Sequence, residues 1–271
     1  AFFARSGLYD AMREGGDGLV PMARPAQGDH TTGLALVAAV LAALRLAERT
    51  GEGQVVETSL YETAVWTQAS DYSVTAIDQA PVRRRGRHEM LAISANRFPC
   101  KDGKWVVFNM MPDAAYWPRL CQTLEIEELM EDERFTDSSS RYRNMSTLVH
   151  LFDAALSKRT RDEWGEIFDK AGLIWGPVMC LHEVPQDPQA NELGLFPEID
   201  HPDVGSYRTV NIPMRFATAD VGPQGPAPEM GAHTHEVLAA AGLSPQKIEQ
   251  LKQDGVVADA SSNADATDAG A

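Results

Sequence analysis

Asp29 is the side chain whose type and setting best fit covalent chemistry, because it is a carboxylate between glycines at the start of a long apolar segment. It lies in the run GDHTTG at residues 28–33. As a helix N-cap, Asp29 would accept hydrogen bonds from the first free N–H groups. As a nucleophile, it would attack an activated acyl group to form a mixed anhydride, with backbone N–H groups stabilising the oxyanion. The two interpretations are compatible, since a helix N-terminus stabilises negative charge.

Two other features are candidates for binding. His30 follows Asp29 directly and so points elsewhere; a lone histidine is either a hydrogen-bonded structural residue or a general base. Four arginines lie within five residues, namely Arg83, Arg84, Arg85 and Arg87. They form either a solvated loop or a cationic lip for the phosphates of a small molecule, with Gly86 adding flexibility.

Several other kinds of site are not indicated. His233 and His235 lack the further ligands that a metal site needs. The cysteines at 100, 121 and 180 are widely spaced and are expected to be small buried apolar residues. The pair Gly51 and Gly53 precedes a predicted strand rather than a helix, unlike a phosphate-binding loop. We therefore expect neither a metal site nor nucleoside triphosphate chemistry.

Composition narrows the class of protein. The 271 residues carry a formal charge of −15, with 44% apolar and 23% charged residues. Nucleic acid and anionic lipid are thereby disfavoured as partners, since both need clustered Lys and Arg. The longest uninterrupted apolar run, residues 34–44, is shorter than a membrane span of about 18 residues. Without a leader pattern or paired cysteines, we predict no membrane association and a reducing, cytoplasmic setting.

The elements around Asp29 indicate a layered α/β unit. A helix is predicted from Thr31 to about Glu48, apolar nearly all round and therefore buried between layers. Gly51 stands where a helix stops, and residues 55–60 are β-branched like a strand. A second helix is predicted over residues 61–75.

The middle of the chain indicates a small α+β domain. Strands are predicted over 91–98 and 105–110, and the Asp102-Gly103 pair between them is typical of a hairpin. Helices are predicted over 114–124, 141–157 and 160–171, the last with a capping box from Thr160 and Glu163. Another strand, at 176–180, leads to two short strands within 196–216 and to terminal helices over 234–241 and 245–254.

The order of the motifs resembles that of the family III CoA-transferases, the group of formyl-CoA transferase and carnitine CoA-transferase. The first part of the match consists of ARSG at 4–7, GDHTTG at 28–33 and RTGEGQVVETSL at 49–60. The later part consists of KWVV at 104–107, GPV at 176–178, EV at 183–184, DPQ at 187–189, HP at 201–202 and GAHTHEVL at 231–238. The resemblance spans residues 1–257.

This resemblance implies an α/β fold: a partial Rossmann-like large domain plus a small α+β domain. The first half of the large domain is expected to be absent from this chain. Residues 1–80 would be the second part of that domain, 81–180 the small domain, 181–257 a segment returning to the large domain, and 258–271 a disordered tail. Family members form interlinked homodimers, so the full-length form is expected to do the same.

The resemblance also assigns a function, the transfer of CoA from an acyl-CoA thioester to a carboxylic acid. Asp29 matches the catalytic aspartate, which forms an aspartyl anhydride and then an aspartyl-CoA thioester. The substrates would be a small acyl-CoA and a carboxylic acid, with no permanently bound cofactor and no metal. The residues expected to contact substrate or CoA are Gly28, His30, Arg85, Gly86 and Arg87.

The sequence departs from formyl-CoA transferase at the mobile glycine-rich loop, where residues 83–88 contain one glycine among arginines. A larger or anionic acyl group is therefore expected, since guanidinium groups favour carboxylates. Two alternatives remain open. One is an acyl-CoA racemase acting by α-proton transfer, and the other is a non-catalytic fragment of a split or truncated enzyme.

Overall fold

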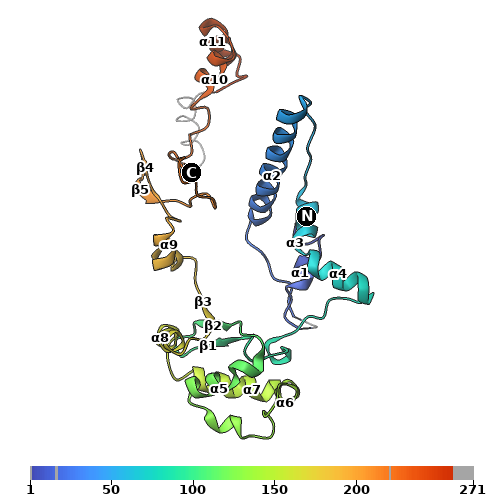
Figure 1. The fold of residues 1–271 in the computed structure, drawn as a ribbon. Coiled ribbons are helices and arrows are strands. Elements are labelled where there is room, and N and C mark those ends of the chain that lie inside the picture. The colour runs from blue at the N-terminus through green and yellow to red at the C-terminus, as the bar shows by residue number, and fades with distance from the viewer. Residues whose placement is uncertain (1, 16–17, 220, 259–271) are drawn as a thin grey trace. The chain divides into compact units, whose positions relative to one another are not determined.

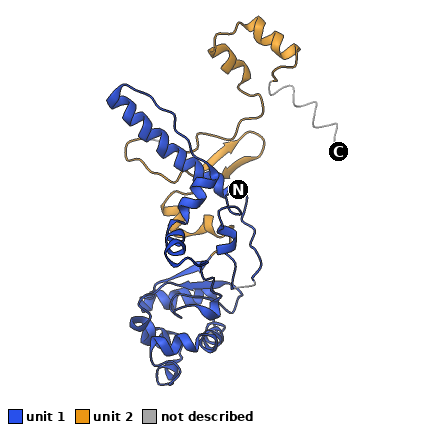
Figure 2. Cartoon of the chain, turned by 90° about the vertical axis from the view of Figure 1, so that its right-hand side faces the viewer, with its two compact units in different colours: residues 1–178 blue, residues 179–271 orange. Residues whose placement is uncertain are grey.

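The computed structural model describes residues 2–15, 18–219 and 221–258 (Figure 1). The chain divides into two compact units, Ala1–Val178 and Met179–Ala271 (Figure 2). Both helices and small sheets are present, so the predicted α/β class is confirmed. The predicted tail falls almost wholly on 259–271, outside the described residues.

The first unit begins with four helices. They are α1 (Leu8–Ala11), α2 (Gln27–Thr50), α3 (Leu60–Thr67) and α4 (Ala69–Asp78). Helix α2 is the predicted apolar helix, but it starts at Gln27, four residues before the predicted Thr31. It ends as predicted at Gly51, whose φ of 79° is the left-handed conformation that glycine adopts without strain.

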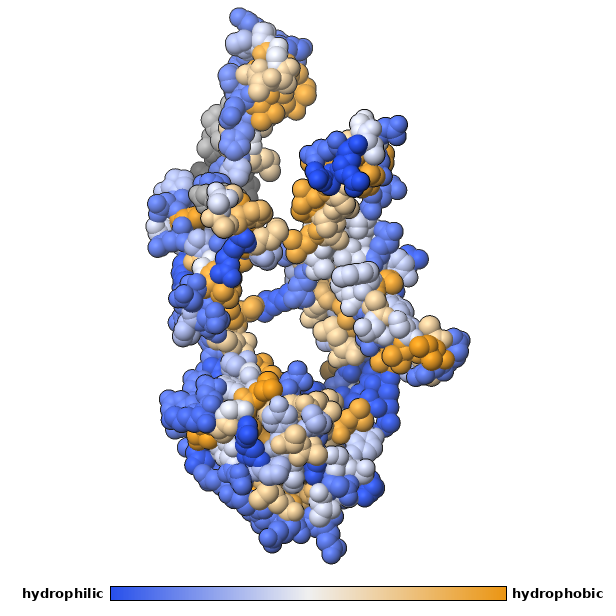
Figure 3. Space-filling model, viewed as in Figure 1, coloured by the Kyte–Doolittle hydropathy of each residue, from blue (hydrophilic) through white to orange (hydrophobic). Residues whose placement is uncertain are grey.

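The prediction that α2 is buried between layers is wrong for this chain taken by itself. Gly28 is its one buried residue, whereas Leu41 is 60% and Leu44 54% exposed. Figure 3 shows apolar side chains at the surface along α2. The reason is that its main neighbour, α3, has 8 residues and covers only part of a 24-residue helix.

Helix α2 also differs from the expectation that no segment is apolar enough to cross a membrane. Among the described helices, α2 is long and apolar enough to cross a membrane, judged by length and composition alone. A helix in the core of a soluble protein can be equally long and apolar. The length and composition of α2 are therefore equally typical of a helix that other protein surface covers.

The strand predicted at residues 55–60 is absent from the structure. Val55 is 88% exposed and pairs with no strand, and a strand needs a partner for its backbone N–H and C=O groups. Instead, Ser59 caps α3: its Oγ accepts from the Glu62 N–H at 3.1 Å and donates to Glu62 Oε2 at 2.7 Å. The predicted helix over 61–75 is likewise two helices, broken at Gln68.

A three-stranded antiparallel sheet forms the centre of the small α+β region. It consists of β1 (Arg97–Pro99), β2 (Trp105–Phe108) and β3 (Trp175–Val178), with β2 in the middle. The Asp102-Gly103 turn joins β1 to β2 as predicted, and Gly103 has a φ of 75°. Of the strand predicted over 91–98, only the C-terminal end is a strand in the structure, where it begins β1.

Helices pack on this sheet and enclose the main core. They are α5 (Asp113–Leu124), α6 (Ser138–Arg143), α7 (Met145–Leu156) and α8 (Arg161–Ala171), with 3-10 turns η1 (Arg87–Glu89) and η2 (Glu127–Met130). The predicted capping box of Thr160 and Glu163 is present at α8. Phe98, Phe152 and Phe168 are fully buried, so aromatic contacts between sheet and helices dominate this core.

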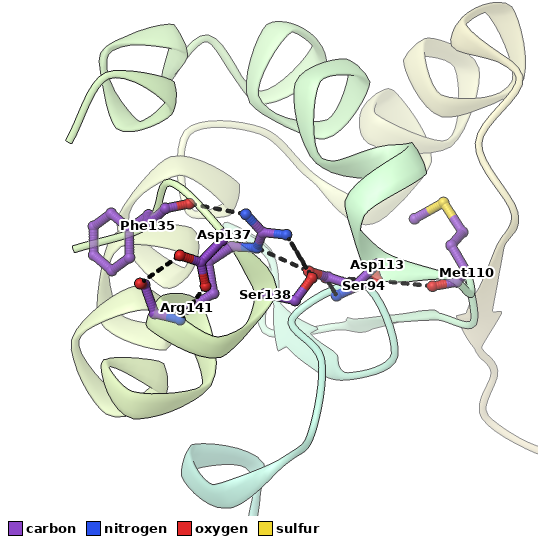
Figure 4. Close-up of polar contacts among 8 residues, drawn as sticks. Ser94, Met110, Asp113, Phe135, Asp137, Ser138 and Arg141 are labelled. Carbon is purple, nitrogen blue, oxygen red and sulfur yellow. Dashed lines mark hydrogen bonds and ion pairs between the residues drawn. The ribbon is translucent and has the colours of Figure 1, made fainter. Parts of the chain in front are cut away.

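A buried polar network joins α5 to α6 inside this region (Figure 4). Arg141 donates from Nε to Asp113 Oδ2 at 2.8 Å and from Nη1 to the Phe135 carbonyl at 2.8 Å. Ser94 donates to Asp113 Oδ1 at 2.9 Å, and Arg141 lies 4.7 Å from the centre of the Trp117 ring. Because these groups are buried, their mutual bonds replace those that water would make.

The second unit has short elements. They are η3 (Val184–Gln186), α9 (Pro188–Glu192), β4 (Glu198–His201), β5 (Gly205–Arg208), α10 (Thr234–Ala240) and α11 (Pro245–Gln253). Strands β4 and β5 pair antiparallel, which confirms the two short strands predicted within 196–216.

The cysteines provide a test of burial. Burial raises the pKa of the Cys121 thiol from the ordinary 9.0 to about 12 and that of Cys100 to about 11, whereas Cys180 is exposed. We expect iodoacetamide to modify Cys180 alone in the native protein at pH 8, because the thiolate is the nucleophile, and to modify all three cysteines after denaturation. Mass spectrometry counts the adducts.

The same shifts predict the pH dependence of folding. The folded pKa values lie above those of the unfolded chain, so the stabilisation is complete below about pH 9 and is lost as pH rises toward 11 and 12. Urea unfolding at increasing pH measures this loss. The variant Cys121→Ala is expected to weaken the dependence, and an unchanged dependence would show that Cys121 is not protected.

Candidate functional site

Asp29 lies in the first turn of α2, as the third residue of the helix. The N-cap is Ala26, with a φ of 68°, so the N-cap interpretation of Asp29 is wrong. No side chain caps this end of the helix, which leaves its first backbone N–H groups available. Asp29 is exposed, and its carboxylate has no hydrogen bond or ion pair with any described residue.

A small cavity of about 280 Å³ opens beside Asp29. Its lining residues are Phe2, Phe3, Ala4, Tyr9, Ala23, Arg24, Pro25, Ala26, Gly28, Asp29 and Leu60. Three of them are aromatic: Phe3 stacks on Tyr9 with ring centres 5.3 Å apart and meets Phe2 edge-on at 5.0 Å. The cavity therefore combines an apolar wall, an unpaired carboxylate and the cation of Arg24.

Arg24 was not among the residues expected at the site. It lies five positions before Asp29, in a loop whose glycines and prolines gave no regular spacing to interpret. The chain turns at Ala26 and brings both residues to one cavity. A cation beside this cavity fits a site that handles carboxylates, because guanidinium groups pair with them.

The N-terminal segment that carries Phe2 and Phe3 is held by hydrogen bonds from Gln68, which lies between α3 and α4, and from Tyr72 of α4. Gln68 Nε2 donates to the Ser6 carbonyl at 3.2 Å, and the Tyr72 hydroxyl donates to the same oxygen at 2.6 Å. Ser6 is buried and donates to the Phe2 carbonyl. The ARSG motif thus positions Phe2 and Phe3 through these bonds.

Gly28 has a packing role in the structure. A Cβ at this position would lie 2.7 Å from Phe2 Cγ and 2.8 Å from Phe2 Cβ. Glycine therefore allows α2 to begin against the Phe2 ring. Its predicted contact with substrate stays a prediction.

Gly28→Ala tests this close approach, with Gly33→Ala in the same helix as its control, because nothing lies within 4 Å of a Cβ at Gly33. Both changes add the same helix propensity. We expect Gly28→Ala to be less stable than Gly33→Ala by roughly 1–3 kcal/mol, the usual cost of overpacking. Urea unfolding followed by circular dichroism measures the difference, and equal midpoints would contradict the packing role.

His30 is exposed, and its backbone N–H bonds to the Ala26 carbonyl at 2.9 Å. Its imidazole has no hydrogen bond or ion pair with the described part of the chain. A binding role for His30 stays a prediction.

The four clustered arginines have different surroundings. Arg87 forms an ion pair with Asp153 and lies 5.5 Å from the Phe98 ring centre and 5.4 Å from that of Trp105. These contacts attach η1 to the small α+β region, while the Nε atom of Arg87 is buried without a hydrogen-bond partner. A binding role for Arg87 stays a prediction. Arg84 bonds to Asp10 at 2.8 Å.

Gly86 and Arg85 lie beside residues 11–14 near the start of the chain. A Cβ at Gly86 would lie 3.6 Å from Glu14 Cγ, an ordinary contact. Arg85 lines a separate cavity of about 700 Å³, which we call the arginine cavity. Its lining residues are Ala11, Met12, Arg13, Glu14, Val82, Arg83, Arg84, Arg85, Met90, Leu91, Ala92, Ala95, Arg97 and Met111.

The structure therefore divides the predicted site residues. Gly28 and Asp29 line the small cavity, Arg85 lines the arginine cavity, and the two cavities share no lining residue. Within the described ranges no group of three or more His, Cys, Asp or Glu side chains could hold a metal ion. The arrangement presents an exposed carboxylate at one cavity and a cluster of arginines at another.

The chain is mixed α/β and carries an exposed carboxylate in the first turn of a long apolar helix. The family model described as CoA-transferase family III matches residues 1–234, and the chain belongs to this family.

Two curated relatives are similar over nearly the whole chain. The (R)-2-hydroxy-4-methylpentanoate CoA-transferase of Clostridioides difficile is 29% identical over 95% of this chain and 64% of its own length. The cinnamoyl-CoA:phenyllactate CoA-transferase of Clostridium sporogenes is 27% identical over 94% of this chain and 62% of its own length. The chain thus spans less than two thirds of either relative.

A solved structure confirms the fold. The crystal structure of a CAIB/BAIF family protein from Brucella suis superposes with a TM-score of 0.77 at 26% identity. The superposed region is 88% of this chain and 61% of the Brucella suis chain.

Proposed function

We propose that this protein transfers CoA from an acyl-CoA thioester to a carboxylic acid, with Asp29 as the nucleophile. The observation that carries the proposal is the exposed, unpartnered carboxylate at an uncapped helix start beside a partly aromatic cavity. Membership of family III and the two CoA-transferase relatives support the activity. Their different acyl groups leave the substrate open.

The proposed chemistry proceeds in four balanced steps. An Asp29 oxygen attacks the thioester carbonyl carbon, the C–S bond breaks, and CoA leaves as its thiolate. The thiolate then attacks the aspartyl carbonyl of the anhydride and releases the donor acid, which leaves an aspartyl-CoA thioester. The acceptor carboxylate attacks that thioester and forms a second anhydride with release of thiolate. Finally, the thiolate attacks the acceptor carbonyl and restores the Asp29 carboxylate.

The surroundings of Asp29 fit this sequence of steps. Each addition places negative charge on a carbonyl oxygen, and uncapped N–H groups at the α2 terminus are suitable donors to it. The Arg24 guanidinium is placed to attract the carboxylates that enter and leave the small cavity. The aromatic side chains of Phe2, Phe3 and Tyr9 give one side of the cavity an apolar surface that suits the carbon atoms of an acyl group.

Proton transfer at an α-carbon is the competing chemistry. It requires a base such as histidine beside the reacting carbon, and His30 neither lines the cavity beside Asp29 nor forms a hydrogen bond or ion pair with the Asp29 carboxylate in the described structure. Deuterium wash-in at the α-carbon without acceptor acid distinguishes the two reactions. The transferase is expected to show none.

The adduct on Asp29 gives a direct test of the proposed function. The protein is incubated with a panel of acyl-CoA thioesters, treated with hydroxylamine and digested for mass spectrometry. We expect a hydroxamate at Asp29 with the true donor, because hydroxylamine attacks the anhydride or thioester. A modification confined to other carboxylates would overturn the assignment.

We also propose the domain and assembly scheme implied by the family. Residues 1–80 and 181–257 contribute to a large domain, 81–180 form the small domain, and the active cytoplasmic form is an interlinked homodimer. The exposed apolar side chains of α2 support association, since such surface is normally covered. We expect light scattering to show association of the chain, whereas a well-behaved monomer would count against the scheme.

A further inference from the structure

We propose that Tyr9 is a further catalytic residue, whose hydroxyl donates a hydrogen bond to the acyl carbonyl oxygen while Asp29 attacks the carbonyl carbon. The inference rests on the proposed function and adds a second side chain to it. Tyr9 lies in α1 and lines the same cavity as Asp29. The nucleophile and the donor thus face one space, in which a single carbonyl group meets both.

The Tyr9 hydroxyl has a hydrogen bond that uses its oxygen but not its proton. The Ala23 N–H donates to Tyr9 Oη at 3.3 Å, and Ala23 itself lines the cavity. Among the described residues, none accepts a hydrogen bond from this hydroxyl. A tyrosine hydroxyl donates one hydrogen bond while its oxygen accepts another. The Tyr9 proton is therefore available to a ligand in the cavity.

Tyr72 shows by contrast what a committed hydroxyl looks like in this chain. Its hydroxyl donates to the Ser6 carbonyl at 2.6 Å, so its proton already has an acceptor. Tyr72 does not line the cavity beside Asp29, and Tyr9 is the one tyrosine among the described residues that does.

Contacts on the inner side of the chain fix the position of the Tyr9 ring. Phe3 stacks on it with an angle of 18° between the rings, and the Tyr9 N–H donates to the Phe3 carbonyl at 3.1 Å. Phe3 meets Phe2, and Phe2 packs against Gly28, the residue before Asp29. A series of contacts thus connects the donor to the turn that carries the nucleophile. A donor held in place in this way needs little reorganisation during the reaction.

The distances that the reaction requires suit a cavity of this size. A carbonyl carbon under attack lies about 3–3.5 Å from its nucleophile. The oxyanion that forms lies about 2.7–3.1 Å from its donors. The volume of about 280 Å³ is at the small end of ligand sites, roughly 300–1,000 Å³, so one carbonyl group reaches across the cavity.

The proposed step balances without any proton transfer. As an Asp29 oxygen bonds to the carbonyl carbon, the π electrons of the C=O bond move to oxygen, and the Tyr9 hydroxyl stabilises that charge. When these electrons return, the C–S bond breaks and CoA leaves as its thiolate. Tyr9 keeps its proton throughout. The uncapped N–H groups of α2 are suitable as further donors to the same oxygen.

Tyr9→Phe tests the role of the hydroxyl, because it keeps the ring that stacks on Phe3. The whole chain is incubated with acetyl-, butyryl-, succinyl- or cinnamoyl-CoA, and the adduct on Asp29 is trapped with hydroxylamine over time. We expect adduct formation to slow about a hundredfold, since loss of one oxyanion donor costs roughly 10²–10³ in rate. Tyr142→Phe is the matched control: Tyr142 is an exposed tyrosine of α6 that does not line the cavity, and its variant should react at the wild-type rate.

The outcomes separate this inference from the proposed function. Wild-type protein that forms no adduct on Asp29 with any of these thioesters would contradict the proposed function itself. An adduct that forms equally fast in wild type and in Tyr9→Phe would overturn the role of Tyr9 and leave the nucleophile in place.

A spectroscopic measurement distinguishes donation to the substrate from support of the loop through Ala23. The donor that labels wild type fastest is prepared with ¹³C at its thioester carbonyl and bound to Asp29→Asn, which forms no anhydride. We expect its infrared C=O band at lower wavenumber in Asp29→Asn than in Asp29→Asn/Tyr9→Phe, because a hydrogen bond to oxygen weakens the C=O bond. Identical band positions in the two proteins would overturn the inference, since a purely structural hydroxyl does not contact the carbonyl.

Discussion

Asp29→Asn is expected to reduce CoA transfer by at least about a thousandfold, because an amide cannot form the anhydride that every later step requires. The side chain keeps its size and its position in the first turn of α2. The loss should appear in kcat, and the hydroxylamine-trapped adduct should disappear with it. Initial rates of thioester exchange, followed by chromatography, measure the effect.

Asp71→Asn is a closely matched control. Asp71 is also exposed and is also the third residue of its helix, α4, but it lies outside the cavity beside Asp29. Both variants lose the same favourable interaction with a helix N-terminus, about 0.3–1 kcal/mol. Activity of Asp71→Asn near wild type would attribute the loss to chemistry. Comparable activity in the two variants would remove Asp29 from the mechanism.

Arg141→Leu is expected to destabilise the small α+β region by about 3–5 kcal/mol. Its side chain is 3% exposed and lies 2.7 Å from Asp113 Oδ2, so the substitution leaves a buried carboxylate without its cation. The Phe135 carbonyl loses a donor as well. Urea unfolding followed by the fluorescence of buried Trp117 and Trp164 measures the change.

Two further variants identify the cause. Arg143→Leu, in the same helix, removes an arginine that is exposed and donates to Ser140 Oγ at 2.9 Å; its cost should stay within about 1 kcal/mol. The double variant Asp113→Leu/Arg141→Leu should be more stable than Arg141→Leu, because no lone charge remains buried. A double variant less stable than either single change would show that packing, rather than charge pairing, dominates.

Local sequence signals determined the features that depend on neighbouring residues. The Asp102-Gly103 hairpin, the Thr160 capping box and the stop at Gly51 each follow from backbone preferences or bonds within a few positions. Ser59 and Glu62 belong to the same class: their spacing predicts a helix start, but the β-branched residues before it favoured a strand. That strand failed because pairing is not local.

The motif order also determined the family, and with it Asp29 as the proposed nucleophile. What surrounds Asp29 was decided by tertiary structure. Phe2 packs against Gly28, and the turn at Ala26 places Arg24 at the same cavity. Contacts of this kind, between segments far apart in the sequence, leave no periodic pattern in the sequence.

The arginines at residues 83–87 show most clearly what the sequence determines and what only the tertiary structure decides. Arg85 and Arg87 are two positions apart and chemically identical, so the sequence by itself assigns them the same role. In the folded chain, Arg87 pairs with Asp153 and lies near the rings of Phe98 and Trp105, whereas Arg85 has no ion pair with a described residue and lines the arginine cavity. Residue type determined the available charge, and the partners brought from distant segments decided which arginines are paired, because ion pairs form between side chains that only the fold brings together.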